Sequence, residues 1–159
     1  MKGKGKIVIL MSVFVLFLTG FALAEEKCPL CGMNIAGNEN TAFVIEKNSG
    51  ETITYCCPHC GLWVVSQEGK DIKSAKSRDM ISGEWLDASK AVYLFGSKAT
   101  PACTPSWLSF GDKAEAEMFQ KGFGGTILIY EEALKKRASM PQGMEEPKGS
   151  EKKEENPKK

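Results

Sequence analysis

The sequence predicts a small single domain of the α+β class, built from two related strand-turn-strand-helix units. The chain has 159 residues, a length that suits one folded domain. Short apolar runs separated by glycine, proline and asparagine predict strands, and a segment with helical features follows each pair of such runs. The two ends of the chain differ from this middle part in composition, so the predicted fold lies between them.

The first unit begins with a predicted β-hairpin. Residues 41–46 and 52–55 are rich in threonine, isoleucine and aromatic side chains, and a turn at residues 48–50 separates them. Pro58 suits the first turn of a helix, because proline lacks the backbone N–H that this position leaves unpaired. We therefore expect a short helix from Pro58 through Val65.

The second unit follows a polar stretch, residues 67–78, and a short strand predicted near residues 79–82. Residues 91–95 and 107–110 are predicted strands joined by a loop that holds two prolines. Asp112 is followed three residues later by a glutamate, a capping-box pattern that predicts the start of the helix completing this unit.

The helix of the second unit is predicted to pack through Ala114, Met118 and Phe119, which share one face. Glycines end it, and residues 126–130 predict another strand. A last helix is predicted at residues 131–137, since glutamates open it and basic residues close it, as the helix dipole favours. Five aromatic residues are assigned to the core: Phe43, Trp63, Trp85, Trp107 and Phe119.

The N-terminal residues 1–24 predict an export signal. Three lysines precede an apolar run, and Ala22-Leu-Ala24 supplies a small-x-small cleavage pattern. The alternative is a retained membrane anchor, because residues 7–24 are uncharged and almost reach the roughly 20 residues needed to span a bilayer. Both interpretations place the rest of the chain outside the cytoplasm, in the periplasm or its equivalent.

The remainder of the chain divides into two parts. Residues 25–138 are predicted to form the folded domain, and residues 139–159, rich in lysine and glutamate, are predicted to be a disordered charged tail. The formal net charge of +1 argues against nucleic-acid binding. The single histidine excludes sites built from several imidazoles. No arrangement of a nucleophile with a general base predicts an enzyme.

Six cysteines dominate the candidate chemistry. Cys28-Pro-Leu-Cys31-Gly and Cys57-Pro-His-Cys60-Gly share one pattern, and two such knuckles can complete a tetrahedral metal site. The spacing leaves three interpretations open: a structural zinc site, disulfides, which are common after export, and a thiolate site for Cu(I), which prefers sulfur. Adjacent side chains of a strand point to opposite faces, so Cys56 and Cys57 are not both expected to reach one ion without a bend.

Motifs spread over most of residues 28–132 carry a resemblance to a known family. They are Cys28-Pro-Leu-Cys31-Gly-Met33, Tyr55-Cys56-Cys57, Trp85-Leu-Asp-Ala88 leading into residues 91–95, Thr100-Pro101, Phe110, residues 114–119 and Gly124-Gly-Thr-Ile-Leu128. In these positions the chain resembles the NosL family, accessory proteins of nitrous oxide reductase that bind Cu(I) outside the cytoplasm. The spacing Cys56-x3-Cys60 is also similar to that of the metal-sensing TRASH domains.

The resemblance implies an exported copper-binding accessory protein, a Cu(I) metallochaperone that serves nitrous oxide reductase or another copper enzyme. The implied partners are a copper ion and a copper-accepting enzyme or a copper-export or assembly complex. Membrane contact is expected only if the signal segment is retained. The alternative is a binding domain stabilised by Zn(II) or disulfides, with no role in metal transfer.

The candidate metal ligands are all sulfur residues: Cys28, Cys31, Cys57, Cys60, Cys103 and Met33. Met33 would be a thioether ligand, the alternative being a core methionine. Cys103 lies in a loop restricted by two prolines, where family members often carry a methionine one position earlier. We expect Cys103 to approach the knuckles as an additional thiolate ligand or as the transfer residue, the alternative being a buried inert thiol. His59, within the second knuckle, is expected to be solvated, the alternative being a metal ligand.

Overall fold

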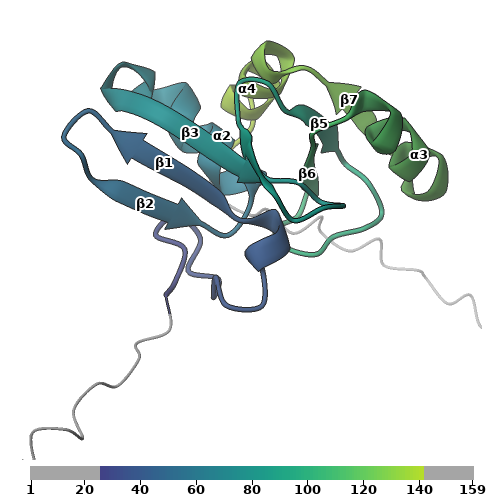
Figure 1. Cartoon of the computed structure of the whole chain (residues 1–159), viewed down its shortest axis with the longest axis horizontal. Helices are drawn as coiled ribbons and strands as arrows, with labels where there is room; N and C mark the ends of the chain where they lie inside the picture. The colour runs from purple at the N-terminus through teal and green to yellow at the C-terminus, as the bar shows by residue number, and fades with distance from the viewer. Residues whose placement is uncertain (1–25, 142–159) are drawn as a thin grey trace, which may run out of the picture.

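The computed structural model describes residues 26–141 as an α+β arrangement of two antiparallel sheets and three α-helices (Figure 1). The fold class predicted from the sequence is therefore confirmed. The predicted export signal, residues 1–24, and residues 142–159 of the charged tail lie outside the described residues. None of the helices in the described part of the chain is long and apolar enough to cross a bilayer.

The first sheet has four antiparallel strands in the order β2-β1-β3-β4. They are β1 (Phe43–Lys47), β2 (Thr52–Tyr55), β3 (Ile72–Arg78) and β4 (Trp85–Asp87). Strands β1 and β2 form the hairpin that the sequence predicts. Phe43 and Ile45 of β1 are fully buried, because alternate side chains of a strand point to the same face. Helix α2 (Pro58–Glu68) packs against β1.

Strand β3 corrects the prediction for residues 67–82, in which a polar stretch preceded a strand at residues 79–82. The polar stretch itself contains β3, since pairing with β1 on one side and β4 on the other stabilises a segment of low intrinsic strand preference. Residues 80–82 form a turn instead. In this turn the Asp79 carboxylate accepts a hydrogen bond from the backbone N–H of Ile81 (2.7 Å).

The second sheet has three antiparallel strands in the order β6-β5-β7. They are β5 (Val92–Phe95), β6 (Trp107–Phe110) and β7 (Thr126–Leu128). Helix α3 (Lys113–Phe123) joins β6 to β7, and α4 (Tyr130–Ala138) follows β7. Each unit thus runs strand-strand-helix-strand with its first strand in the middle. The prediction of two related units is confirmed, and β4 is an extra edge strand of the first.

The predicted packing face of α3 is partly wrong. Ala116 is fully buried and Phe119 packs beside it against the second sheet. Ala114 and Met118 are exposed, Met118 by 65%. The reason is the phase of the helix: successive residues lie about 100° apart around its axis, so Met118 does not share the face of Phe119.

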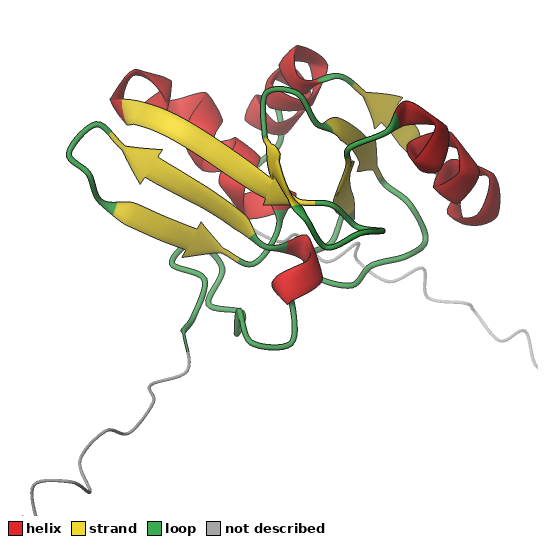
Figure 2. Cartoon of the chain, viewed as in Figure 1, coloured by secondary structure: helices red, strands yellow, loops and turns green. Residues whose placement is uncertain are grey.

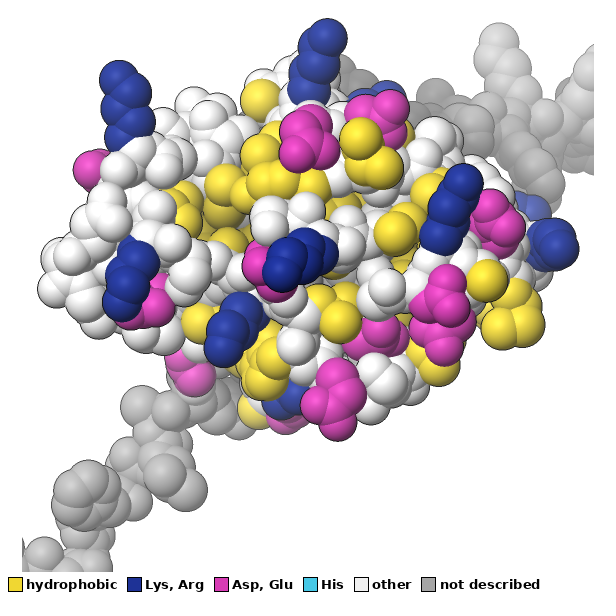
Figure 3. All heavy atoms as spheres, turned by 45° about the horizontal axis from the view of Figure 1, so that its top comes forward, with side chains coloured by type: hydrophobic (Ala, Val, Ile, Leu, Met, Phe, Trp, Pro, Cys, Tyr) yellow, Lys and Arg dark blue, Asp and Glu magenta, His cyan; other side chains and the backbone are white. Residues whose placement is uncertain are grey.

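Trp85 is not in the core, where it was predicted to lie. It lies on the edge strand β4, its side chain is 39% exposed, and the Arg78 guanidinium lies 4.2 Å from its ring centroid. Such a stacked cation stabilises an aromatic ring at the surface. Phe43 and Trp107 are buried as predicted. On the face drawn in Figure 3, basic and acidic side chains are interspersed rather than gathered by sign.

Helix α2 occupies the interior of the molecule. It contacts β1 of the first sheet, β6 of the second sheet and α4. Seven of its eleven residues are buried. The loop that precedes β1 runs along one edge of the molecule (Figure 2), and its cysteines meet those at the start of α2. The first turn of α2 is therefore enclosed by protein.

Candidate metal centre

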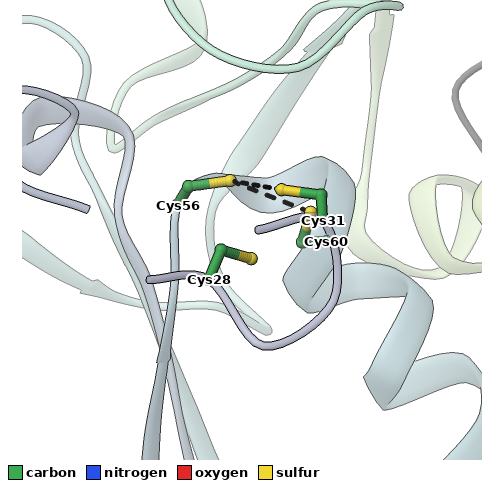
Figure 4. A group of neighbouring side chains, drawn as sticks. All are labelled: Cys28, Cys31, Cys56 and Cys60. Atoms are coloured by element: carbon green, nitrogen blue, oxygen red, sulfur yellow. Dashed lines mark hydrogen bonds between the residues drawn. The ribbon is translucent and has the colours of Figure 1, made fainter. Parts of the chain in front are cut away.

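The six cysteines of the chain meet at the first turn of α2. Cys28 and Cys31 come from the loop before β1, Cys56 and Cys57 from the segment after β2, Cys60 from α2, and Cys103 from the loop between β5 and β6. Figure 4 shows four of the sulfur atoms, those of Cys28, Cys31, Cys56 and Cys60, pointing toward one another. All six side chains are free thiols.

The first Cys-x-x-Cys-Gly pattern folds as a closed knuckle. The backbone N–H of Cys28 donates to the Met33 carbonyl, and the N–H of Gly32 donates to the Cys28 carbonyl, both at 2.8 Å. Gly32 has a φ of 76°, a left-handed conformation that glycine adopts without steric cost. This knuckle has the structure that the sequence predicts.

The second Cys-x-x-Cys-Gly pattern forms the start of a helix rather than a separate knuckle. Cys57 is the N-cap of α2 and Pro58 lies in its first turn, as predicted. The Cys57 carbonyl accepts hydrogen bonds from the N–H groups of Cys60 and Gly61, each at 3.1 Å. Gly61 is needed for packing, because a Cβ atom there would overlap the Phe43 ring. Two patterns that look alike in sequence therefore have different backbone roles.

Cys56 lies at the centre of the thiol cluster, by which we mean the sulfur atoms of residues 28, 31, 56, 57, 60 and 103. Its Sγ lies 3.5 Å from the Sγ of Cys31, 3.6 Å from those of Cys57 and Cys103, and 3.8 Å from that of Cys60. The Cys103 Sγ lies 3.7 Å from that of Cys31 and 3.8 Å from that of Cys60. Two groups have all their sulfur separations within 4.8 Å: Cys28, Cys31, Cys56 and Cys60, and Cys56, Cys57, Cys60 and Cys103.

Cys56 and Cys57 lie close together because the chain has the bend that the sequence-based expectation made the condition for both to reach one ion. Strand β2 ends at Tyr55 and the chain bends at the next two residues, so both sulfurs lie on the same side and 3.6 Å apart. Cys56 belongs to both four-sulfur groups and Cys57 to one of them. The candidate ligand set named Cys57 and omitted Cys56. The spacing Cys56-x3-Cys60 was the signal that pointed to the omitted residue.

Burial separates one thiol from the other five. Cys28, Cys56, Cys57, Cys60 and Cys103 are exposed by 2% or less, whereas Cys31 is half-buried. Cys31 is therefore the sulfur of the cluster that solvent or a partner reaches most easily.

The two remaining candidates behave differently. Cys103 is brought into the cluster, within 3.8 Å of three other sulfurs. Its burial suits a ligand better than a residue that hands the ion to a partner. Met33 is half-buried and packs against the same apolar core as the cysteines, and its role as a thioether ligand stays a prediction.

Hydrogen bonding within the cluster distributes the protons unequally. Hydrogen bonds donated by neighbouring thiols, those of Cys56 first, lower the pKa of Cys28 and of Cys103. The same contacts, with Cys103 as the largest cause, raise the pKa of Cys56 and of Cys60. Burial raises the pKa of Cys31 to about 11. These shifts favour thiolate character on Cys28 and Cys103 and favour protons on Cys31, Cys56 and Cys60 in the metal-free cluster.

Arg137, which no sequence pattern singled out, supplies a positive charge beside these thiols. Its side chain is fully buried, and its Nε donates to the His59 carbonyl at 2.8 Å. Burial lowers its pKa, and attraction to Cys60, Cys57 and Cys103 opposes that shift. Within residues 26–141, Arg137 forms no ion pair with a carboxylate, and its Nη2 has no hydrogen-bond partner. The thiols are its electrostatic partners.

The expectation that His59 is solvated is wrong, because the start of α2 turns this side chain into the protein. His59 is only 4% exposed. Among the described residues its Nδ1 has no hydrogen-bond partner, and its side chain contributes a smaller part of the lowering of the pKa of Cys103, after Cys56, Cys57 and Cys60. His59 therefore faces the thiol cluster from one side.

The donor set and its spacing fit a soft metal ion. Thiolates select Cu(I) and Zn(II) over hard cations. At a metal–sulfur distance of about 2.3 Å, the ligands of a tetrahedral ion lie about 3.8 Å apart and those of a trigonal ion about 4 Å apart. The closest sulfur pairs lie 3.5–3.8 Å apart, so only small shifts are needed for either geometry.

The fold and the thiol cluster together define a small cysteine-rich α+β domain whose mostly buried thiols could hold a soft metal ion. The sequence profile of the NosL family matches residues 22–137, and the chain therefore belongs to the NosL family. Family membership confirms the expectation that the chain is not an enzyme.

Two known proteins are similar to this chain. The fold resembles the crystal structure of the copper chaperone NosL from Shewanella denitrificans, with a TM-score of 0.61 and 21% identity, covering 72% of this chain and 94% of that one. Part of the chain is 28% identical over 80 residues to the HTH-type transcriptional repressor CutR of Bacillus subtilis (strain 168). That match covers 50% of this chain and 42% of the repressor, so the chain spans less than half of that relative.

Proposed function

We propose that this chain is an exported Cu(I) metallochaperone, which holds the ion in the thiol cluster and passes it to a copper enzyme or to a copper-export or assembly complex. The observation that carries the proposal is the convergence of six free thiols on one point, five of them buried and Cys31 half-buried. Membership of the NosL family supports it. So does the likeness of the fold to a protein described as a copper chaperone.

Two features favour Cu(I) over Zn(II) as the cargo. Thiolates are the ligands that Cu(I) prefers, and the cluster offers more thiols than the four that a structural zinc site uses. A structural zinc site is also closed to new ligands. Here Cys31 lies at the edge of the cluster, where a sulfur ligand from an acceptor protein can attack the bound ion.

All six cysteines of the thiol cluster are assigned as candidate ligands. One group consists of Cys28, Cys31, Cys56 and Cys60, and the overlapping group consists of Cys56, Cys57, Cys60 and Cys103. Exchange is assigned to Cys31. An acceptor's thiolate or thioether binds the ion on that side, Cys31 dissociates, and the inner thiolates are released afterwards. Met33, two residues further along the same loop, is a candidate thioether for the exchange step.

We further propose that the domain acts outside the cytoplasm, since residues 1–24 have the pattern of an export signal. Nitrous oxide reductase is the acceptor that the family resemblance implies, and another copper enzyme is the alternative. The intact mass of the protein isolated from cells tests the first point: cleavage gives a chain that begins at Glu25. Recovery of the full-length chain in the membrane fraction would support a retained anchor instead.

The choice of metal is tested by competition under anaerobic, reducing conditions. The protein is loaded with Zn(II) and then titrated with Cu(I) against a chelator of known affinity, and both metals are counted. We expect Cu(I) to displace Zn(II). A zinc-loaded protein that Cu(I) cannot displace would overturn the proposal and favour the structural-zinc alternative. A protein that binds neither ion would also overturn it.

Transfer is tested with Cys31→Ser, which removes the most accessible sulfur. We expect slower release of Cu(I) to a soluble acceptor. Met118→Ala is the matched control, because Met118 is an exposed sulfur residue on α3, away from the cluster. Equal transfer rates for Cys31→Ser and the wild type would show that exchange does not pass through Cys31.

A further inference from the structure

We propose that the thiol cluster binds more than one Cu(I) ion per chain, in a single polynuclear cluster bridged by thiolates. This inference rests on the proposed function, since it concerns the same site and cargo, and it adds the number of ions and the way they share ligands.

One ion cannot account for the arrangement of the sulfurs. A tetrahedral ion uses four thiolates and a trigonal ion uses three. Six thiols are nevertheless gathered into two four-sulfur groups that share Cys56 and Cys60. A mononuclear site would leave two or three buried thiols next to the ion without a role. Thiolates that bridge two ions give more of these sulfurs a role, and further ions would be needed to engage all six.

The sulfur positions contain two adjoining triangles whose sides are a few tenths of an ångström shorter than the roughly 4 Å that trigonal Cu(I) requires. The first joins Cys31, Cys56 and Cys103, with sides of 3.5, 3.6 and 3.7 Å. The second joins Cys56, Cys60 and Cys103, with sides of 3.6, 3.8 and 3.8 Å. They share the side between Cys56 and Cys103. One Cu(I) in each triangle would make these two sulfurs the bridging ligands.

The positive charge of each entering Cu(I) ion is offset by the protons that leave the thiols it binds. When a Cu(I) ion enters and binds a thiol that was protonated, one proton leaves, so one positive charge replaces another. No electron is transferred and no bond other than S–H is broken. If every sulfur bridges two ions and every ion binds three sulfurs, six thiolates hold roughly four ions at most. The buried Arg137, attracted to Cys57, Cys60 and Cys103, offsets part of the remaining negative charge.

The two triangles differ in access, which gives their ions different roles. The triangle with Cys31 includes the half-buried sulfur, whereas all three members of the other are exposed by 2% or less. The outer ion is therefore the one delivered first. The inner ion keeps Cys56 and Cys103 in place for the next outer ion.

The test is the number of copper ions per monomer. The metal-free full chain is titrated with Cu(I) under anaerobic, reducing conditions, and native mass spectrometry counts the ions on the monomer. X-ray absorption at the copper edge reports whether copper has a copper neighbour. We expect more than one Cu(I) per monomer, a copper–copper contact, and two rates of removal by a chelator.

The outcomes separate this inference from the proposed function. Saturation at one Cu(I) per monomer without a copper neighbour would overturn the polynuclear cluster and leave the metallochaperone proposal standing. Additional copper found only in dimers would also overturn it, because the bridging sulfurs would then come from two chains. A protein that binds no Cu(I) at all would overturn both.

A variant tests the bridging assignment. Cys103→Ser removes a corner of both triangles and leaves the group of Cys28, Cys31, Cys56 and Cys60 intact, so the expected stoichiometry falls to one ion. Met118→Ala is the matched control and should keep the wild-type number. If Cys103→Ser still holds the wild-type number of ions with a copper neighbour, the bridging assignment is wrong. Should the variant not fold, the copper count and absorption spectrum of the wild type decide the question alone.

Discussion

The two strand-strand-helix-strand units have the same topology but place their helices in different environments. Seven of the eleven residues of α2 are buried, among them His59 and Cys60. In α3, also eleven residues long, only Ala116 is buried. The first turn of α2 is enclosed by loops that carry cysteines, whereas α3 starts at the surface with Asp112 as its N-cap. A buried thiolate site can therefore form in the first unit and not at the matching place in the second.

This difference shows that topology alone does not define a site. The same order of strands and helix recurs, yet chemistry appears only where the helix start is covered on several sides. The covering elements come from the whole chain: the loop before β1, the loop between β5 and β6, and α4 through Arg137. The second unit thus completes the site of the first.

The largest expected effect comes from a glycine in α2. Gly61→Ala places a Cβ atom in the Phe43 ring, so α2 must move away from β1 and displace Cys57 and Cys60. We expect a loss of about 3 kcal/mol in the free energy of unfolding and weaker Cu(I) binding. Urea denaturation and a Cu(I) titration measure the two effects.

A glycine in α3 provides the matched control. A Cβ atom at Gly122 meets no other atom within 4 Å, so Gly122→Ala should stabilise the protein by about 0.5–1 kcal/mol through helix propensity and leave Cu(I) binding unchanged. Equal effects of the two substitutions would contradict the contrast drawn between the helices.

Arg137→Met is expected to have the next largest effect. The substitution removes the hydrogen bond from Nε to the His59 carbonyl and the positive charge beside the thiols. We expect a loss of about 2 kcal/mol in the free energy of unfolding, together with lower Cu(I) affinity. Arg78→Met is the control, because Arg78 is a half-buried arginine that stacks on Trp85 and donates to the Gly83 carbonyl; it should cost about 1 kcal/mol of stability and leave Cu(I) affinity unchanged. Wild-type Cu(I) affinity in Arg137→Met would show that the arginine has only a structural role.

Sequence patterns predicted the parts of this protein that local chemistry determines. The hairpin ending at Tyr55, the helix beginning at Pro58 and the cap at Asp112 follow from turn, proline and capping preferences. Strand β3 was missed because its lysines and serines are ordered by pairing with neighbouring strands. Arg137 was missed because the His59 carbonyl that it binds and the thiols beside it are distant in sequence and meet it only in the folded chain.

The sequence predicted that cysteines from several segments converge, but it did not predict how their sulfur atoms are arranged. The two Cys-x-x-Cys patterns pointed to four converging thiols, and the proline-bounded loop with its family resemblance pointed to Cys103. The place of Cys56 depends on the bend after β2, which no local pattern specifies. The sulfur-to-sulfur contacts that join all three segments are long-range and become visible only in the structure.

The pH dependence of Cu(I) binding distinguishes the thiol cluster from the rest of the domain. A thiol must lose its proton to bind the ion, and burial raises the pKa of Cys31 to about 11. Cys31 is therefore protonated at neutral pH, and the Cu(I) affinity should rise about tenfold for each pH unit through this proton alone. Titrations at several pH values measure the slope. The slope of log affinity against pH equals the number of protons released on binding. In Cys31→Ser this number should fall by one, and an unchanged slope would show that Cys31 is not a ligand.

The smallest expected effect concerns the two helix caps. In α3 the Asp112 carboxylate accepts a hydrogen bond from the Ala114 N–H at 2.8 Å, so Asp112→Ala should cost about 1 kcal/mol of stability and leave the copper count unchanged. Cys57, the N-cap of α2, forms no such side-chain bond, and serine is a preferred N-cap residue. Cys57→Ser should therefore keep the metal-free stability within about 0.5 kcal/mol of the wild type while weakening Cu(I) binding. Denaturation and copper counting on both variants separate the two roles. Unchanged copper binding in Cys57→Ser would show that Cys57 acts only as a helix cap. Loss of copper in Asp112→Ala would show that the starts of the two helices are coupled.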